Sequence, residues 1–290
     1  MTGEGAEGGA QIVARVQSVS HVYKRVVALD DVSLEFQHGR MIGVVGPDGV
    51  GKSTLLGLIA GARRLQEGTL EVLGGDMRSS RHRTKVSPRI AYMPQGLGKS
   101  LYQALSIREN LEFFGRMFGL SRDHLQVRIE QLTKATGLHP FLDRPAGKLS
   151  GGMKQKLGLC CALIHDPDLM ILDEPTTGVD PLSRRQLWEL IGAIRKRRPE
   201  MCIVVSTAYM DEAETFDELI AMDAGRVLAE GTPDELKALT ETSSIEAAFI
   251  QLLPEDQRHG YAELEIPSLQ AEDSEIAIVA QQLTRRFGDF

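Results

Sequence analysis

A glycine-rich stretch over residues 46–54 carries residue types that bind phosphate groups. Glycines leave backbone N–H groups free to surround phosphate oxygens, a lysine reaches the β- and γ-phosphates, and the next serine holds Mg²⁺. The pattern therefore predicts a phosphate-binding loop; the alternative is a glycine-rich turn with an exposed lysine. The residues are, in order, Gly46, Pro47, Asp48, Gly49, Val50, Gly51, Lys52, Ser53 and Thr54.

Two adjacent carboxylates follow an apolar run. Asp173 and Glu174 come directly after residues 169–172, which are expected to form a buried strand. Ligands bind at the carboxyl ends of strands in parallel sheets. Asp173 is suited to coordinate Mg²⁺, and Glu174 to orient or deprotonate an attacking water. Alone, such a pair is more often a solvated turn, but together with the phosphate loop it favours a catalytic site.

A third segment offers a helix N-terminus to an anion. Ser150 is placed as the N-cap, and Gly151 and Gly152 leave backbone N–H groups unobstructed before Met153. One chain rarely needs two triphosphate sites. We therefore expect this segment to contact the nucleotide of a facing subunit.

The elements that position these residues alternate between strands and helices, which predicts an α/β protein with a mostly parallel sheet. Residues 12–36 resemble an antiparallel pair, and the spacing of apolar residues over 104–165 predicts a helical block. Ser243 and Glu246 fit a capping box for a final helix. The other expected elements are strands at 41–45, 169–172 and 202–205, helices after 53 and around 187–194, and a hairpin at 219–222 and 226–230.

The composition is that of a soluble globular protein and excludes several classes. The 290 residues are 42% hydrophobic and 25% charged, with a net charge of −7. The net negative charge of the whole chain does not indicate a nucleic-acid-binding protein. Apolar runs stay well short of the roughly 20 residues of a transmembrane helix. Three cysteines without metal or disulfide spacing suit a reducing cytosol.

The sequence outside the main domain is expected to comprise a tail, a linker and the beginning of a repeat. Residues 1–10 are acidic and glycine-rich and are expected to be a disordered tail, and residues 254–275 are expected to be an acidic linker. Residues 276–290 repeat the pattern of residues 12–26, which predicts the truncated first strand of a second, similar domain. Chance similarity between two amphipathic strands is the alternative.

The motifs above, together with Tyr23, Gln95 and Asp180, stand in an order that resembles the ATPase domain of ABC proteins over about residues 11–253. The resemblance implies ATP and Mg²⁺ as ligands. It also implies an α/β P-loop NTPase fold of the ABC type: a RecA-like mixed sheet core with an antiparallel β subdomain and an inserted α-helical subdomain at about 96–167.

The resemblance assigns roles to individual residues. Tyr23 would stack on adenine, Gln95 would link the Mg²⁺ site to the helical block, and Ser150 to Gly152 would contact ATP across a head-to-tail dimer. Catalytic roles fall on Glu174, Asp173, Gln95 and Lys52, and Mg²⁺ binding on Ser53, Gln95 and Asp173. The cofactor-binding residues are then Tyr23, the loop from Gly46 to Thr54, the segment from Ser150 to Met153, and Asp180.

Stretches 46–53, 93–102, 144–188 and 206–214 resemble more closely the first ATPase domain of ribosome-associated tandem ABC ATPases, which carry a C-terminal membrane region. The partners implied are a second ABC domain or another copy of this one, a membrane domain, and the ribosome through RNA. The implied location is cytoplasmic, peripheral to the inner membrane. Basic residues at 78–89 and 195–198 suit either RNA phosphates or solvated surfaces. DNA is not expected, because residues 53–149 hold no long coiled-coil or zinc-bearing insertion.

One position departs from the ABC pattern. A histidine that contacts the γ-phosphate normally follows the Ser-Thr pair after the last core strand, and here Ala208 follows Thr207. We expect MgATP binding with slow hydrolysis at this site, unless Thr207, Tyr209 or a water substitutes. Three functions stay open: the ATPase of a membrane exporter, a ribosome-linked ATPase, and a nucleotide-gated dimerisation module with little hydrolysis.

Overall fold

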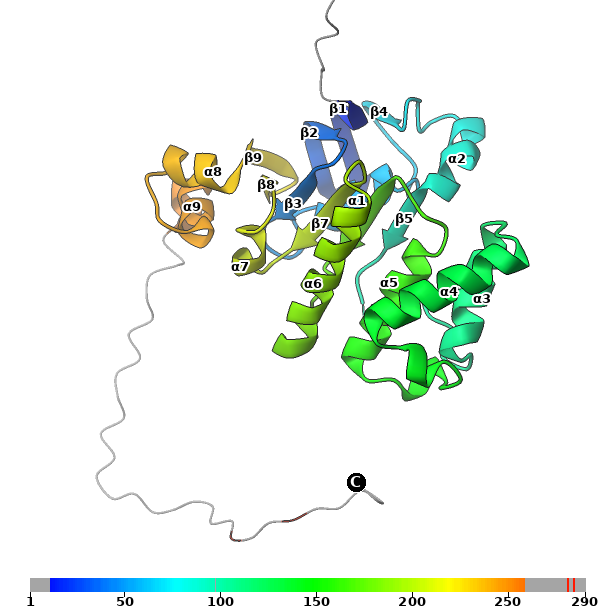
Figure 1. Ribbon diagram of the computed structural model, residues 1–290. Coiled ribbons are helices and arrows are strands. Elements are labelled where there is room, and N and C mark those ends of the chain that lie inside the picture. Colours follow the sequence, from blue (N-terminus) through cyan, green and yellow to red (C-terminus); the bar gives the residue numbers. More distant parts are fainter. Residues whose placement is uncertain (1–10, 97, 259–280, 282–283, 285–290) are drawn as a thin grey trace, which may run out of the picture.

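The computed structural model describes residues 11–96, 98–258, 281 and 284. The expectations for residues 1–10, for 259–275 and for the repeated strand at 276–290 therefore lie outside the described residues, apart from two isolated positions. The architecture is shown in Figure 1.

A six-stranded sheet forms the centre of the molecule, in the order β5-β6-β7-β3-β8-β9. All neighbours pair in parallel except β8 and β9, which form the hairpin expected from the sequence. The strands are β3 (Met41–Val45), β5 (Ile90–Met93), β6 (Leu169–Asp173), β7 (Cys202–Thr207), β8 (Glu218–Asp223) and β9 (Arg226–Gly231).

A second, antiparallel sheet packs beside the first, in the order β2-β1-β4. Its strands are β1 (Ile12–Tyr23), β2 (Val26–Gln37) and β4 (Thr69–Val72), and α2 (Ser80–Val86) lies beside it at the upper edge of Figure 1. The antiparallel opening predicted for residues 12–36 is confirmed.

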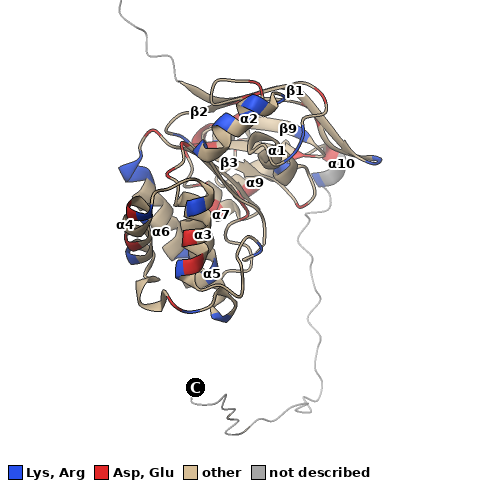
Figure 2. Ribbon diagram, turned by 90° about the vertical axis from the view of Figure 1, so that its right-hand side faces the viewer, with Lys and Arg blue, Asp and Glu red and all other residues tan. Residues whose placement is uncertain are grey.

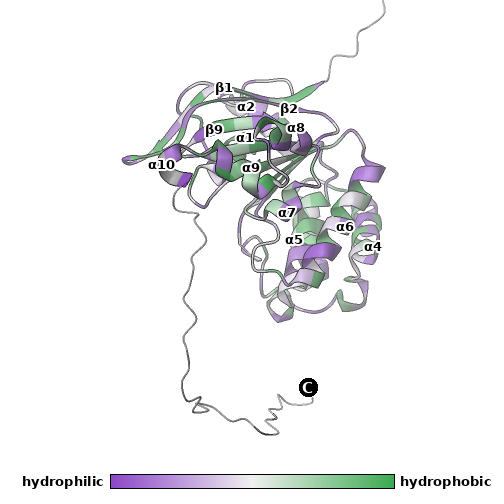
Figure 3. Ribbon diagram, turned by 90° about the vertical axis from the view of Figure 1, so that its left-hand side faces the viewer, coloured by the Kyte–Doolittle hydropathy of each residue, from purple (hydrophilic) through white to green (hydrophobic). Residues whose placement is uncertain are grey.

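Alternating side chains of the central strands face two different apolar clusters. Ile42 and Val44 of β3 pack with α1 (Lys52–Ile59) and the antiparallel sheet, while Met41 and Val45 face the helices on the opposite side. Alternation of this kind is the pattern of a strand buried on both faces. Figure 3 shows hydrophobic strands through the middle of this core and hydrophilic segments on outer helices such as α4.

The predicted helical block is confirmed, and it has its own apolar cluster. It contains α3 (Ile107–Met117), α4 (Arg122–Thr136) and α5 (Gly151–Leu163), with short 3₁₀ turns at His139–Phe141 and Ala146–Lys148. A capping box formed by Ser106 and Glu109 starts α3, and left-handed Gly137 ends α4. Figure 2 shows charges of both signs on α3 and α4, and only Lys and Arg on α2.

Five helices and one further 3₁₀ turn complete the described chain: α6 (Pro181–Arg197), α7 (Met210–Ala213), α8 (Pro233–Leu239), α9 (Ile245–Leu252), α10 (Glu255–Arg258) and the 3₁₀ turn Ser87–Arg89. The capping box expected at Ser243 is wrong by one residue, because Ser244 is the extended N-cap and accepts from the Ala247 N–H. α10 occupies the first part of the expected linker. Within residues 11–96 and 98–258, no helix is long and apolar enough to cross a membrane.

Candidate functional site

The site lies where three neighbouring strands of the central sheet end. In the parallel register, Asp173 at the end of β6 is opposite Ser206 of β7, and Val45 at the end of β3 is opposite Thr207. The segments that follow these strands therefore meet at one edge of the sheet. This is the edge at which ligands bind in α/β proteins.

The phosphate loop joins β3 to α1, as the sequence predicts, and its glycines have positive φ angles: 150° at Gly46, 84° at Gly49 and 108° at Gly51. A Cβ atom at Gly46 would collide with the Met222 carbonyl oxygen, and one at Gly51 with the Ala28 carbonyl oxygen. Gly49 has open space around it. Two of the glycines are thus required both by conformation and by close packing.

Lys52, the first residue of α1, is 4% exposed and folds back over the loop. Its Nζ donates to the carbonyl oxygens of Gly46 (2.7 Å) and Pro47 (2.8 Å), and it lies 3.8 Å from Glu174 Oε1. Burial lowers the pKa of Lys52, against the opposing charges of Glu174, Asp48 and Asp173. A cation desolvated in this way is well placed to bind phosphate oxygens.

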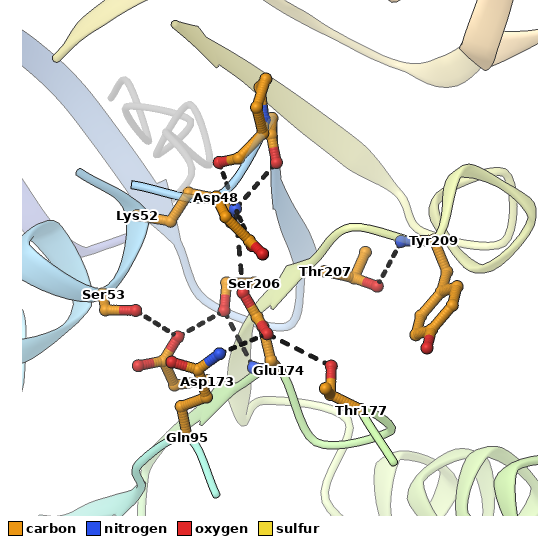
Figure 4. A network of polar contacts seen from close by, with 12 residues as sticks. Asp48, Lys52, Ser53, Gln95, Asp173, Glu174, Thr177, Ser206, Thr207 and Tyr209 are labelled. Carbon is orange, nitrogen blue, oxygen red and sulfur yellow. Dashed lines mark hydrogen bonds and ion pairs between the residues drawn. The ribbon is translucent and has the colours of Figure 1, made fainter. Parts of the chain in front are cut away.

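Two of the three side chains expected to hold Mg²⁺, Ser53 and Asp173, are in contact (Figure 4). Ser53 Oγ donates to Asp173 Oδ1 at 2.9 Å, and Ser206 Oγ donates to the same oxygen at 2.6 Å. A serine hydroxyl can bind Mg²⁺ through its lone pairs while its proton still donates to a carboxylate. Within the described residues, no group of three His, Cys, Asp or Glu side chains could enclose a metal. That fits Mg²⁺, which uses few protein carboxylates together with substrate phosphates.

Glu174 is held by three polar groups. Gln95 Nε2 donates to Glu174 Oε2 at 2.6 Å, and Thr177 Oγ1 donates to the same oxygen at 3.2 Å. The backbone N–H of Glu174 donates to Ser206 Oγ at 2.9 Å. Its φ of 49° is unusual for a residue other than glycine and costs on the order of 1 kcal/mol or more. The protein therefore holds this carboxylate in one orientation at a conformational cost.

A pocket of about 470 Å³ opens in front of these groups. Tyr23, at the end of β1, forms one wall, and the guanidinium of Arg63 lies 5.3 Å from the centre of its ring. Tyr23, to which the resemblance assigns adenine stacking, therefore lines the same pocket as the phosphate loop. The lining residues are Tyr23, Val26, Ala28, Asp48, Gly49, Gly51, Lys52, Ser53, Thr54, Gln95 and Glu174.

The segment 150–153 and Asp180 lie away from this pocket, against each other. Ser150 caps α5 by accepting from the Met153 N–H (3.3 Å), and a Cβ at Gly152 would collide with the Ser183 hydroxyl. Asp180 caps α6 by accepting from the Ser183 N–H (2.9 Å), and hydrogen bonding to Ser183 lowers the pKa of Asp180. The two N-termini thus form one exposed edge, as a contact with a facing subunit requires.

Ala208 is exposed, and its neighbours are already engaged. Thr207 Oγ1 donates to Glu212 Oε2 (2.8 Å) and accepts from the Tyr209 N–H (3.0 Å). The Tyr209 ring lies under the Arg184 guanidinium at 3.9 Å and points away from Glu174 (Figure 4). In this arrangement neither side chain lines the pocket in front of Lys52 and Glu174.

Three residues of this region were not predicted from the sequence to act in the site: Ser206, Thr177 and Glu212. Ser206 contacts both carboxylate residues, and Thr177 contacts Glu174. The signal for Ser206 is a hydroxyl near the end of an apolar strand, and that for Thr177 is a hydroxyl three residues after Glu174, whereas Glu212 gives no signal of its own. These signals are weak without knowledge of strand order.

Together, the mixed sheet, the glycine-rich loop at its edge and the paired carboxylates define a P-loop nucleotide-binding protein. The family model described as "ABC transporter" matches residues 29–177, just over half of the chain. The chain belongs to this family.

Known relatives agree with this assignment. The probable multidrug ABC transporter ATP-binding protein YbhF of Escherichia coli is 35% identical over 264 residues, covering 89% of this chain and 44% of YbhF. The chain thus spans less than half the length of this relative. A solved ATP-binding subunit of an ABC transporter is 28% identical with a TM-score of 0.74, covering 83% of this chain and 99% of its own.

A dimeric ATP-binding cassette, MJ0796, solved with ADP and Pi bound, has a TM-score of 0.69 at 23% identity and covers 76% of this chain and 98% of its own. The expected fold class, an α/β P-loop NTPase of the ABC type, is confirmed. The chain is an ABC-type ATPase domain that binds ATP with Mg²⁺.

Proposed function

We propose that this chain is the ATP-binding part of an ABC exporter and couples ATP binding and hydrolysis to export. The observation that carries the proposal is the meeting of Lys52, Ser53, Asp173 and Glu174 at one edge of the sheet. The exporter assignment is supported by YbhF, which is named as part of a multidrug transporter.

Each residue of the site has a proposed role. Lys52 binds the β- and γ-phosphates with the loop N–H groups, and Ser53, Asp173 and Gln95 hold Mg²⁺. When bound, Mg²⁺ neutralises charge on the phosphates. Glu174 accepts the proton of the attacking water or orients it, with Gln95 and Thr177 holding its carboxylate. Tyr23 stacks on the adenine.

The partners are proposed from the exposed edge formed by residues 150–153 and Asp180. Two ABC domains would pair head to tail, with this edge closing the nucleotide site of the other domain. The other domain is a second ABC domain or another copy of this one, and the helical block binds the membrane domain. This places the chain on the cytoplasmic side of the inner membrane. The ATPase domain proposed from the sequence covers residues 11–253.

We propose further that hydrolysis at this chain's own site is slow. Ala208 cannot donate a hydrogen bond to the γ-phosphate, and Thr207 and Tyr209 are engaged by Glu212 and Arg184. Losing one donor to developing charge costs about 10²- to 10³-fold in rate. Without turnover, the domain would act as a nucleotide-gated dimerisation module.

The test is a comparison of MgATP affinity and turnover for the wild type, Ala208→His and Glu174→Gln. We expect similar affinities in all three, faster turnover in Ala208→His by at least about tenfold, and none above background in Glu174→Gln. Rapid wild-type hydrolysis that Glu174→Gln abolishes would refute the slow site while supporting the catalytic role of Glu174. Absence of MgATP binding would refute the function as a whole.

A ribosome-linked role rests on the sequence resemblance alone. Arg83, one of the bases considered for RNA contact, donates instead to the carbonyl oxygens of Met77 and Arg78. Co-sedimentation of the full-length protein with ribosomes, with and without a non-hydrolysable ATP analogue, separates this role from export. We expect no nucleotide-dependent sedimentation.

A further inference from the structure

A buried carboxylate near the site has no role in the chemistry described above. Glu212 lies on α7 and is 5% exposed. A charge buried to this degree is costly unless hydrogen bonds or an opposite charge compensate it. The contacts of Glu212 therefore indicate what it does.

One oxygen of Glu212 joins the two segments that border the catalytic carboxylate. Its Oε2 accepts from Thr176 Oγ1 at 3.1 Å and from Thr207 Oγ1 at 2.8 Å. Thr176 is two residues after Glu174 in the chain, and Thr207 directly precedes Ala208. Both threonines are fully buried. A single carboxylate oxygen thus bridges the segment that carries Glu174 and the end of β7.

The other oxygen faces α6. Glu212 Oε1 lies 3.7 Å from Arg184 Nε, and within the described residues neither buried atom has a hydrogen-bond partner. Arg184 also covers the Tyr209 ring. The N-terminus of α6 is Asp180, at the edge proposed to meet a second domain. A small shift of α6 toward α7 would turn this ion pair into a charge-assisted hydrogen bond.

We propose that Glu212 is a positioning residue for ATP hydrolysis, which links the end of β7 to the segment that follows Glu174. The left-handed backbone of Glu174 persists only where the surrounding structure holds it. On its C-terminal side the chain is held first at the Pro175 carbonyl, which accepts from Gln155 Nε2, and then at the Thr176 hydroxyl, which donates to Glu212. Glu212 acts through Thr176 and Thr207 and does not touch the nucleotide. This inference rests on the proposed catalytic role of Glu174.

A purely structural role has a different signature. If Glu212 served only to stabilise the fold, its loss would lower the melting temperature, while the folded fraction would still hydrolyse ATP at the normal rate. A positioning role instead lowers the rate of the chemical step in folded protein, with nucleotide affinity unchanged. The same contrast applies to Thr176, whose hydroxyl hydrogen-bonds to Glu212 and to no other side chain in the part of the chain that the structure describes.

The experiment measures hydrolysis of γ-³²P-labelled ATP under single-turnover conditions, with the full chain in excess over ATP, because this resolves slow rates. ATP affinity and melting temperature are measured on the same proteins. Glu212→Gln is paired with Asp211→Asn, which makes the same charge change at an exposed position of the same helix. Thr176→Val is paired with Thr176→Ser, which keeps the hydroxyl. Glu174→Gln sets the background.

We expect Glu212→Gln and Thr176→Val to hydrolyse ATP roughly 10- to 100-fold more slowly than the wild type, with affinity within about twofold. Asp211→Asn and Thr176→Ser should keep most of the rate. If Thr176→Val hydrolyses ATP as fast as Thr176→Ser, the positioning role is refuted, even where Glu212→Gln does not fold. If neither the wild type nor Ala208→His is faster than Glu174→Gln, the catalytic role of Glu174 fails, and this inference fails with it.

Discussion

Replacing Ser206 with alanine should weaken Mg²⁺ binding more than any other single change outside the expected ligands. Ser206 is fully buried at the end of β7, and its hydroxyl makes two contacts. It donates to Asp173 Oδ1 at 2.6 Å and accepts from the Glu174 N–H at 2.9 Å. The variant removes both contacts without adding volume.

The size of the effect can be worked out contact by contact. The hydrogen bond to Asp173 involves a charged group and contributes about 1.5–3 kcal/mol. The Glu174 N–H keeps its second acceptor, the Ser206 carbonyl oxygen at 3.1 Å, so losing the hydroxyl as an acceptor costs this N–H little. We expect a loss of about 2 kcal/mol in unfolding free energy. Residues that orient metal ligands typically change metal affinity by about 10- to 100-fold.

The assay titrates Mg²⁺ into the ATP-bound protein and follows turnover or the ATP-dependent rise in melting temperature. Binding of ATP in EDTA is the internal control, and it should stay within about twofold of the wild type because Ser206 contacts neither the loop nor Tyr23. If the Mg²⁺ requirement of Ser206→Ala equals that of the wild type, Ser206 does not orient Asp173. The site would then depend on Ser53 alone for this purpose.

Two further predictions test the phosphate loop. Gly51→Ala should lower the free energy of unfolding by about 2–5 kcal/mol, because it combines a positive φ with a collision against the Ala28 carbonyl. Gly49→Ala, which has a positive φ but open space around it, should lower it by only about 1–2 kcal/mol. Equal melting temperatures for the two variants would contradict the packing argument. Because burial lowers the pKa of Lys52, ATP affinity should fall as the pH rises through that lowered value, before an ordinary lysine titrates. The measurement is ATP affinity between pH 8 and 10.5. The affinity of Lys52→Arg should depend less on pH than that of the wild type, because arginine keeps its charge in this range. Parallel pH profiles for the two proteins would rule out Lys52 as the titrating group.

Local patterns were sufficient to predict the phosphate loop and the paired carboxylates. Gly46 to Ser53 and Asp173–Glu174 are each continuous in sequence and each follow an apolar strand, so residue type and spacing carry the information. The parallel core, the β8–β9 hairpin and the helical block follow from apolar periodicity in the same way. Their confirmation shows that local preference and tertiary packing agree in these segments.

Contacts between distant segments could not be predicted. Ser206 meets Asp173 only because β6 and β7 are neighbours in the sheet, although 33 residues separate them in sequence. From its neighbours in sequence, Glu212 is expected to be an exposed acid in a charged stretch. Its burial depends on how α7 packs against β3, β7 and α9. The one-residue error at Ser243 has a similar origin, because two adjacent serines are equally good caps until the backbone selects Ser244.

The pairing of β6 with β7 limits how this protein can be altered. Side chains alternate between the two faces of a strand, so deleting or inserting one residue within β7 would move Ser206 to the opposite face and place a neighbouring side chain beside Asp173. Changes of length in surface turns, such as the one at Ala224 and Gly225 between β8 and β9, leave that alignment intact. Length variation should therefore be tolerated at the surface turns of this domain and strongly selected against within its three central strands.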